Sequence, residues 1–272
     1  MAGVPDIYDV TTAPVSAPRA FGGLSVFDFE DYGEHAGLGM TWDTTACFQS
    51  GFTYNACVDP SRDPLTASGC NIQGYADPFA VYTYDTDSIG AGSRSIAQHE
   101  ANATARLLAA EQWGFEQYLV AYLIANKTDV AMAGLAPAAD GNTTAQRALI
   151  ALATAEEATA QITNNERTLF MNTWLGSLLI SQGALKPFGG VMKTQLGSRV
   201  AITATNPLTG TSPATIYGSG PWKTHRGAVE TLNGTTAPGT AVNDVSIIAQ
   251  RVYAIGTACG VVAVDSGILK VP

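Results

Sequence analysis

Three histidines are the residues of this chain best suited to bind a metal or to transfer a proton near neutral pH. None belongs to an HxxxH, HxH or DxH pair of the kind that begins a metal site. His99 stands beside Glu100 within a helical pattern, and this position predicts a surface pair rather than a ligand. His35 and His225 lie in sections that read as an arm and a loop. The histidines therefore indicate no metal centre.

One carboxylate pair and one glycine-rich turn are the remaining candidates for chemistry. Asp85 and Asp87 could act as paired carboxylates, but they directly precede a predicted helix, whose positive N-terminal end favours acidic residues. Gly218-Ser219-Gly220 reads as a two-glycine turn, and no helix follows it to cradle a phosphate. The GxSxG, P-loop and GxGxxG patterns are absent. The sequence thus predicts no catalytic, cofactor-binding or metal-binding residue, and no enzyme.

The cysteines offer no metal site either. The spacing of Cys47, Cys57 and Cys70 matches no paired CxxC zinc pattern, and Cys259 lies far away in the sequence. We predict free cysteines that act as small apolar side chains. A disulfide within the loop that holds the first three, formed after release from the cell, is the alternative.

Charge is scarce and unevenly placed along the chain. Charged residues make up 14% of the sequence, against about 25% in a typical soluble domain, which favours a surface that faces other protein. The net charge of −9 argues against nucleic-acid binding, which depends on clustered Lys and Arg. Residues 1–129 carry 16 acidic and five basic side chains, and residues 130–272 carry seven and nine. The acidic half is either a solvated face or a surface that lies on the less acidic half of a neighbour.

A long helix from Ser93 to about Lys127 must position most of the other elements. Ser93 offers an N-cap oxygen, and good helix formers fill the interior. At about 1.5 Å per residue, the segment forms a rod of roughly 50 Å. It is either a long core helix or a spine that spans a flat subunit. Its predicted apolar stripe comprises Ile96, Ala103, Leu107, Leu108, Phe115, Leu119, Tyr122 and Leu123.

Shorter elements flank this helix on both sides. Proline and glycine in residues 1–35 predict an extended arm that becomes ordered by lying on another surface. Residues 36–90 read as a protruding β-hairpin loop. After the breaker Gly134–Gly141, we expect a helix at Thr143–Gln161 with Leu149, Ile150 and Leu152 on its apolar side. Further elements are expected at Thr168–Met171 (strand), Asn172–Gln182 (helix), and Leu196–Thr203, Ala214–Tyr217, Asp244–Ile255 and Gly260–Ile268 (strands).

The N-terminus shows neither the basic nor the apolar region of a secretory signal peptide. No run of about 18 apolar residues occurs, so we expect no membrane span and no membrane partner.

The order of arm, loop, long helix, α/β section and closing strands resembles the major capsid proteins of tailed bacteriophages, and most of all those of phages that infect actinobacteria. These proteins have the α+β Hong Kong 97-type fold, which encapsulin shells also use. The passages that carry the likeness are Ala76–Tyr82 with Arg106–Gln112, Thr168–Asn172 with Ser177–Leu179, Gly183 and Gln195–Val200, and Asn243–Arg251.

The resemblance implies a division of the chain into four parts. Residues 1–35 would form the N-terminal arm and residues 36–90 the extended loop. Residues 91–129 and 226–272 would form the peripheral domain, in which the apolar stripe of the helix packs near Val261–Val264. Residues 130–225 would form the axial domain.

Two departures from the family pattern concern covalent crosslinks. Some members join subunits by an isopeptide bond between a lysine of the extended loop and a neighbour's asparagine, assisted by a glutamate. No lysine precedes Lys127, and Ala249 or Gln250 occupies the strand position where the glutamate would fall. We therefore predict no such crosslink, whatever the role of Asn243.

The implied function is structural. The chain would form the hexamers and pentamers of an icosahedral virion capsid, assembled in the host bacterial cytoplasm, and would enclose double-stranded DNA without sequence-specific binding. Its further partners would be a separate scaffolding protein, a portal and decoration proteins. The alternatives are an encapsulin-like nanocompartment shell, a virion surface or tail component that binds a host glycan, and, more remotely, a hydrolase.

Overall fold

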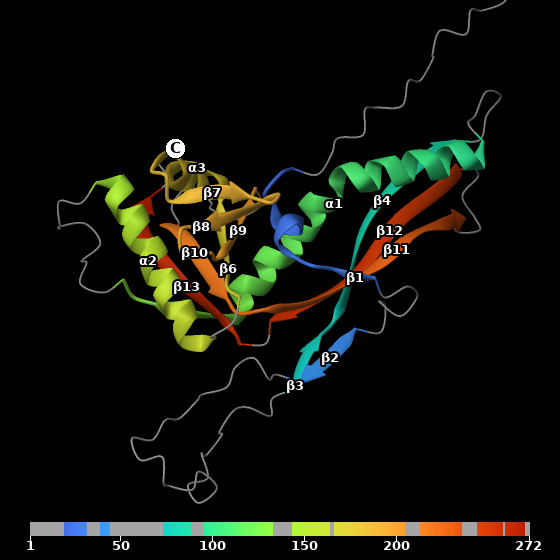
Figure 1. Cartoon of the computed structure of the whole chain (residues 1–272). Helices are drawn as coiled ribbons and strands as arrows, with labels where there is room; N and C mark the ends of the chain where they lie inside the picture. Colours follow the sequence, from blue (N-terminus) through green and yellow to red (C-terminus); the bar gives the residue numbers. More distant parts are fainter. Residues whose placement is uncertain are drawn as a thin grey trace, which may run out of the picture.

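One long helix runs between two sheets in this α+β structure (Figure 1). The computed structural model describes residues 19–31, 39–43, 73–88, 95–132, 143–163, 166–204, 213–235, 244–257 and 259–269. Helix α1 (Ile96–Asn126) starts beside a four-stranded sheet and ends beside a seven-stranded sheet. Its 31 residues give a length of about 46 Å. This confirms the prediction of one unusually long helix.

The four-stranded sheet lies along the N-terminal part of α1. Its strand order is β1-β11-β12-β4, and β1 is the only parallel member among these four. One extra residue in β11 between Arg226 and Val229 makes a β-bulge opposite Arg251 and Tyr253 of β12. The strands are β1 (Glu30–Asp31), β4 (Pro78–Ser88), β11 (Trp222–Thr235) and β12 (Asp244–Thr257).

The seven-stranded sheet is mixed and packs against α2 (Thr144–Ile162) and α3 (Thr173–Ser181). Its order is β5 (Lys127–Val130), β13 (Val261–Leu269), β10 (Pro213–Ser219), β6 (Thr168–Asn172), β9 (Arg199–Thr203), β8 (Val191–Thr194) and β7 (Leu185–Phe188). A separate pair joins β2 (Met40–Asp43) to β3 (Gln73–Ala76), and one 3-10 turn, η1, spans Gly23–Val26.

The two longest helices begin with the same capping device. Ser95 accepts a hydrogen bond from the Gln98 backbone N–H, and the Gln98 side chain accepts one from the Ser95 N–H. Thr143 and Gln146 repeat this arrangement in α2. The predicted cap at Ser93 is therefore wrong, because the reciprocal Ser-x-x-Gln spacing starts at Ser95. Ser93 itself lies outside the described residues.

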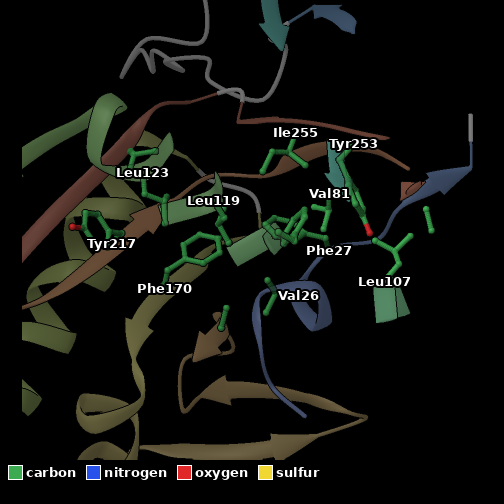
Figure 2. Packing of buried hydrophobic residues seen from close by; sticks show 14 of the residues in the cluster. Val26, Phe27, Val81, Leu107, Leu119, Leu123, Phe170, Tyr217, Tyr253 and Ile255 are labelled. Carbon is green, nitrogen blue, oxygen red and sulfur yellow. The ribbon is translucent and has the colours of Figure 1, made fainter. Parts of the chain in front are cut away.

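The buried face of α1 contacts strands of both sheets and the N-terminal segment. Figure 2 shows Leu107, Leu119 and Leu123 among residues of one cluster, with Val26 and Phe27 from the N-terminal segment. The same cluster includes Val261 and Ala263, which confirms that the stripe reaches β13. The predicted members Ile96 and Leu108 are exposed, because they lie off the row that faces the sheets.

Several other elements depart from the sequence pattern. The strands β7, β8 and β11 were not expected, since lysine, glycine and threonine interrupt their apolar alternation. In α2, Leu152 is buried but Leu149 is exposed, because the buried face consists mainly of alanines. Residues 44–72 of the predicted loop and the predicted breaker Gly134–Gly141 lie outside the described residues.

Cys259 is disulfide-bonded, which contradicts the prediction of free cysteines. Spacing alone tests for zinc motifs, but it does not reveal a pairing between residues far apart in the sequence. The other cysteines, at positions 47, 57 and 70, lie outside the described residues.

Candidate functional site: carboxylates beneath the long helix

Two glutamates lie on the buried face of α1. Glu111 is 3% exposed and Glu116 is 1% exposed. Glu111 falls at four-residue spacing between Leu107 and Phe115, so its position on the apolar face could have been recognised from the sequence. Buried carboxylates need charged or hydrogen-bonding partners, and each of these glutamates has several.

Glu116 fastens the N-terminal segment and β9 to the helix. The Arg19 guanidinium donates through Nη2 to both carboxylate oxygens, at 2.7 and 2.8 Å. The backbone N–H groups of Gly23 and Ala204 donate to the same carboxylate at 2.8 and 2.9 Å. Gln112 adds a fourth donor at 3.0 Å. Groups more than 90 residues apart along the chain therefore meet at one side chain.

The N-terminal segment passes close to α1 at Gly22, so a larger residue there would force the Gln112 side chain to move. A Cβ atom on Gly22 would lie 1.3 Å from Nε2 of Gln112. On its other side, the segment accepts a hydrogen bond at Phe21 from the Ile202 N–H, at 2.8 Å. The described part of the predicted arm thus lies on its own subunit, between α1 and β9.

Glu111 joins α1 to strands β11 and β12. Arg251 Nη1 donates to Glu111 Oε1 at 2.5 Å, and Arg226 Nη2 lies 3.2 Å from the same oxygen. The Tyr253 hydroxyl also donates to Glu111. Burial and this hydrogen bond raise the pKa of Tyr253. Beside this cluster is a surface pocket lined by Asp31, Arg226, Gly227, Ala228 and Arg251.

Asp85 is a further buried carboxylate. It lies on β4, whereas the sequence had suggested a position directly before a helix. His99 Nδ1 is 2.7 Å from Asp85 Oδ2, and Arg106 Nη1 is 2.9 Å from Oδ1. Burial would raise the pKa of Asp85, but the hydrogen bond from His99 and the charge of Arg106 outweigh it and hold the pKa below its usual range. His99 is therefore a buried partner of Asp85, and its predicted surface position is wrong. The side chain of Asp87 lies outside the described residues.

The other predicted candidates are also strand residues or lie beyond the described part. His225 lies in β11 with Nε2 3.4 Å from Glu30 Oε2, and burial lowers its pKa. Gly218 and Ser219 end the buried strand β10, so the predicted two-glycine turn is wrong. Position 35, the remaining histidine, lies outside the described residues.

The described residues hold no group of three His, Cys, Asp or Glu side chains that could bind a metal ion. Of the helices in this part of the chain, none is both long and apolar enough to cross a membrane. The buried carboxylates already accept hydrogen bonds from fixed donors, so their arrangement fastens the arm, the sheets and α1 together.

An apolar row crosses the outer face of the four-stranded sheet, on the side away from α1. Leu232 is opposite Ile248, and Ile248 is opposite Tyr84, so one side chain from each of three strands lies in a line. Tyr84 and Leu232 are exposed, and Tyr82 is exposed in the next row. Exposed aromatic and aliphatic residues in such a cluster mark a candidate protein-contact surface.

Among the solved structures that match this chain over most of its length are the following two. A structure titled Mycobacterium phage Che8 is 15% identical, covers 97% of this chain and 97% of that chain, and has a TM-score of 0.50. The holo-SrpI encapsulin complex from Synechococcus elongatus PCC 7942 is 9% identical, covers 94% of this chain and 91% of that chain, and also has a TM-score of 0.50. No protein-family model matches the chain, and no curated protein matches its sequence.

At these identities the matches show the fold and not the activity. Because they cover 97% and 94% of this chain, they extend over the long helix and both sheets together. The chain therefore has the α+β Hong Kong 97-type fold that its sequence order predicts.

Proposed function

We propose that this chain is a structural subunit of an icosahedral tailed-phage head, which self-assembles into hexamers and pentamers that enclose the genome. The observation that carries the proposal is the shared fold, over 97% of both chains, with the structure from Mycobacterium phage Che8. The chain is then a virion capsid protein rather than an enzyme, with copies of itself as its main partner.

The surface supports an assembling subunit. Only 14% of the residues are charged, so little electrostatic repulsion separates neighbouring copies. The outer row of Tyr84, Ile248 and Leu232 offers apolar area that a neighbour can cover. Many modest contacts repeated over a closed shell give a durable particle through multivalency.

We assign the predicted parts their family roles within this proposal. Residues 1–35 are the arm, 36–90 the extended loop, 91–129 and 226–272 the peripheral domain, and 130–225 the axial domain. Strand β13 then links the two domains, since it belongs to the peripheral part of the chain but pairs with β10. A separate scaffolding protein, a portal and decoration proteins complete the proposed particle, and an actinobacterial host is the sequence-based expectation.

The proposed shell has no lysine–asparagine crosslinks. The sequence contains no lysine in the extended loop. Ala249 is fully buried on the α1 side of β12, and Gln250 donates to Glu230 on the neighbouring strand. Denaturing electrophoresis of intact particles should give a single monomer band. A ladder of covalent multimers would reject this part of the proposal.

Electron microscopy of the purified, expressed protein tests the main proposal. Closed shells or ring-shaped capsomers are the expected result. A discrete monomer or trimer would reject it and would favour the glycan-binding or hydrolase alternatives.

An encapsulin-like shell is the second candidate, because the encapsulin complex from Synechococcus elongatus matches with the same TM-score. The two candidates differ in what the particle contains. Native particles with the ultraviolet absorbance of packaged nucleic acid support the phage head, and particles that hold protein cargo support the nanocompartment.

A further inference from the structure

The pocket at the β11 bulge presents two guanidinium groups to solvent. Asp31, Arg226, Gly227, Ala228 and Arg251 line it, and its volume is about 310 Å3. Bonds to Glu111 use Nη2 of Arg226 and Nη1 of Arg251. Within the described part of the chain, neither guanidinium forms an ion pair with a second carboxylate. Two donors from different strands are thus available at one small depression.

Both arginines are held in place before any ligand arrives. Glu111 fixes the inner edge of each guanidinium, and the Tyr253 hydroxyl fixes Glu111. The Arg226 guanidinium also lies over the ring of Phe29, 5.8 Å from its centroid. A preorganised pair of guanidinium groups binds a planar oxyanion with little loss of side-chain freedom.

The bulge makes the depression. Arg226 pairs with Tyr253 and Val229 pairs with Arg251, so Gly227 and Ala228 bow out of the strand. Bulges re-aim neighbouring side chains and interrupt the regular sheet surface. Gly227 and Ala228 are the two smallest residues and line the pocket beside both arginines.

We propose that this pocket binds the carboxylate of an aspartate or glutamate from a second copy of this chain. The inference rests on the proposed function, in which many copies lie side by side. A cavity of about 310 Å3 suits one side chain rather than a folded domain. Carboxylates are also the most abundant charged groups that a second copy offers, with 23 acidic against 14 basic residues per chain.

Two carboxylates of the same subunit already face the pocket region. Glu111 is buried beneath the arginines and already accepts hydrogen bonds from three side chains. Asp31 lies exposed at the rim, and no ion pair joins it to either arginine within the described part of the chain. Asp31 is therefore the competitor that the test must separate from a neighbour's carboxylate.

Carbodiimide coupling tests the proposal. Arg226→Lys places an amine at the pocket, and the carbodiimide joins it to any carboxylate in direct contact. Particles are assembled from a mixture of nitrogen-14 and nitrogen-15 subunits, and crosslinked peptides are read by mass spectrometry. A link from position 226 to an Asp or Glu peptide of the other isotope is the expected result. Lys223, which pairs with Glu30 of its own subunit, is the internal control and should give links of a single isotope.

Ala228→Lys is the second variant, because it adds an amine at the exposed rim and leaves both arginines and Glu111 unchanged. If Arg226→Lys fails to fold, the same carbodiimide coupling on Ala228→Lys tests the proposal. Closed shells that give only single-isotope links, for example to Asp31, or no links at all, overturn this inference and leave the proposed function standing. A protein that forms no oligomer overturns both.

Discussion

Helices α1 and α2 each cover a sheet, but the side chains at the two interfaces are of different kinds. Beneath α1, the rings of Phe27, Phe29, Phe79 and Tyr253 surround Phe115, and buried carboxylates bind arginines. Beneath α2, the buried residues are mainly Ala148, Ala151, Ala155 and Leu152, which pack against aliphatic strand residues.

The difference predicts opposite sensitivities to mutation. Large rings and ionic bonds span wide gaps, so the α1 interface should suffer most when a group is removed. Small side chains allow close approach, so the α2 interface should suffer most when atoms are added. At Gly218 of β10, an added Cβ would lie 2.1 Å from Thr159 Oγ1 of α2. Beside α1 so close an approach occurs at Gly22, where the added Cβ would meet the flexible end of Gln112, whereas the ring of Phe115 stays 3.6 Å from a Cβ added at Gly23.

Phe115→Ala should be the most damaging single change. The ring is fully buried and makes edge or tilted contacts with four other rings at centroid distances of 5.1–5.9 Å. We expect the free energy of unfolding of the dissociated subunit to fall by about 3–5 kcal/mol, measured by urea denaturation. Trp113→Ala, on the exposed side of the same helix at 62% exposure, should change it by less than about 0.5 kcal/mol. Equal losses in the two variants would contradict the account of α1.

Glu116→Ala should have the next largest effect and lower the free energy of unfolding by about 3 kcal/mol. The change leaves Arg19 unpaired and removes the acceptor of two backbone N–H groups. Glu156→Ala is the matched change in α2. Glu156 accepts hydrogen bonds from the hydroxyls of Thr194 and Ser198 and has no guanidinium partner among the described residues. Its loss should cost about 1–2 kcal/mol. If denaturation shows the larger loss for Glu156→Ala, the contrast between the two interfaces is wrong.

The elements could be predicted from the sequence because their strongest signals are local, and the fold could be predicted because the order of these elements resembles that of a known family. The helical period over α1, the apolar runs of β12 and β13 and their order each depend on neighbouring residues. Strand β11 was missed because its stability comes from pairing with β12 along most of its length.

The buried carboxylates were harder to predict because their partners are distant in sequence. Arg19 and Glu116 are 97 residues apart, and Arg251 and Glu111 are 140 residues apart. Glu111 and His99 carried a usable signal, since both fall on the four-residue row of Ala103, Leu107 and Phe115. Asp85 gave none, because its contact with His99 depends on how β4 folds back along α1.

Gly218→Ala tests the other side of the comparison. The new Cβ would overlap Thr159 Oγ1, so we expect a loss of about 1–3 kcal/mol in the free energy of unfolding. Thr159→Ala removes the obstructing hydroxyl. The double variant should therefore be more stable than the sum of the two single changes predicts. Additive losses would show that the close approach of α2 to β10 is not the cause.

Asp85→Asn should have a modest effect on the free energy of unfolding, and this effect should depend on pH. The pKa of Asp85 lies below its usual value because His99 and Arg106 stabilise the charged form against the opposing effect of burial. In acid the unfolded chain therefore takes up this proton first. The stability that Asp85 contributes is complete above the unfolded-state pKa of 3.8 and is lost as the pH falls through the lower folded-state pKa.

The wild-type subunit should therefore lose more stability than Asp85→Asn between about pH 5 and about pH 2, measured as the free energy of unfolding in urea. At neutral pH the variant should be less stable by about 1–2 kcal/mol, since asparagine keeps the shape but lacks the charge that faces Arg106. Glu157→Gln, on the exposed side of α2, is the matched control and should keep the wild-type acid dependence. Parallel acid curves for wild type and Asp85→Asn would mean that this buried pair does not contribute to the stability of α1 on β4.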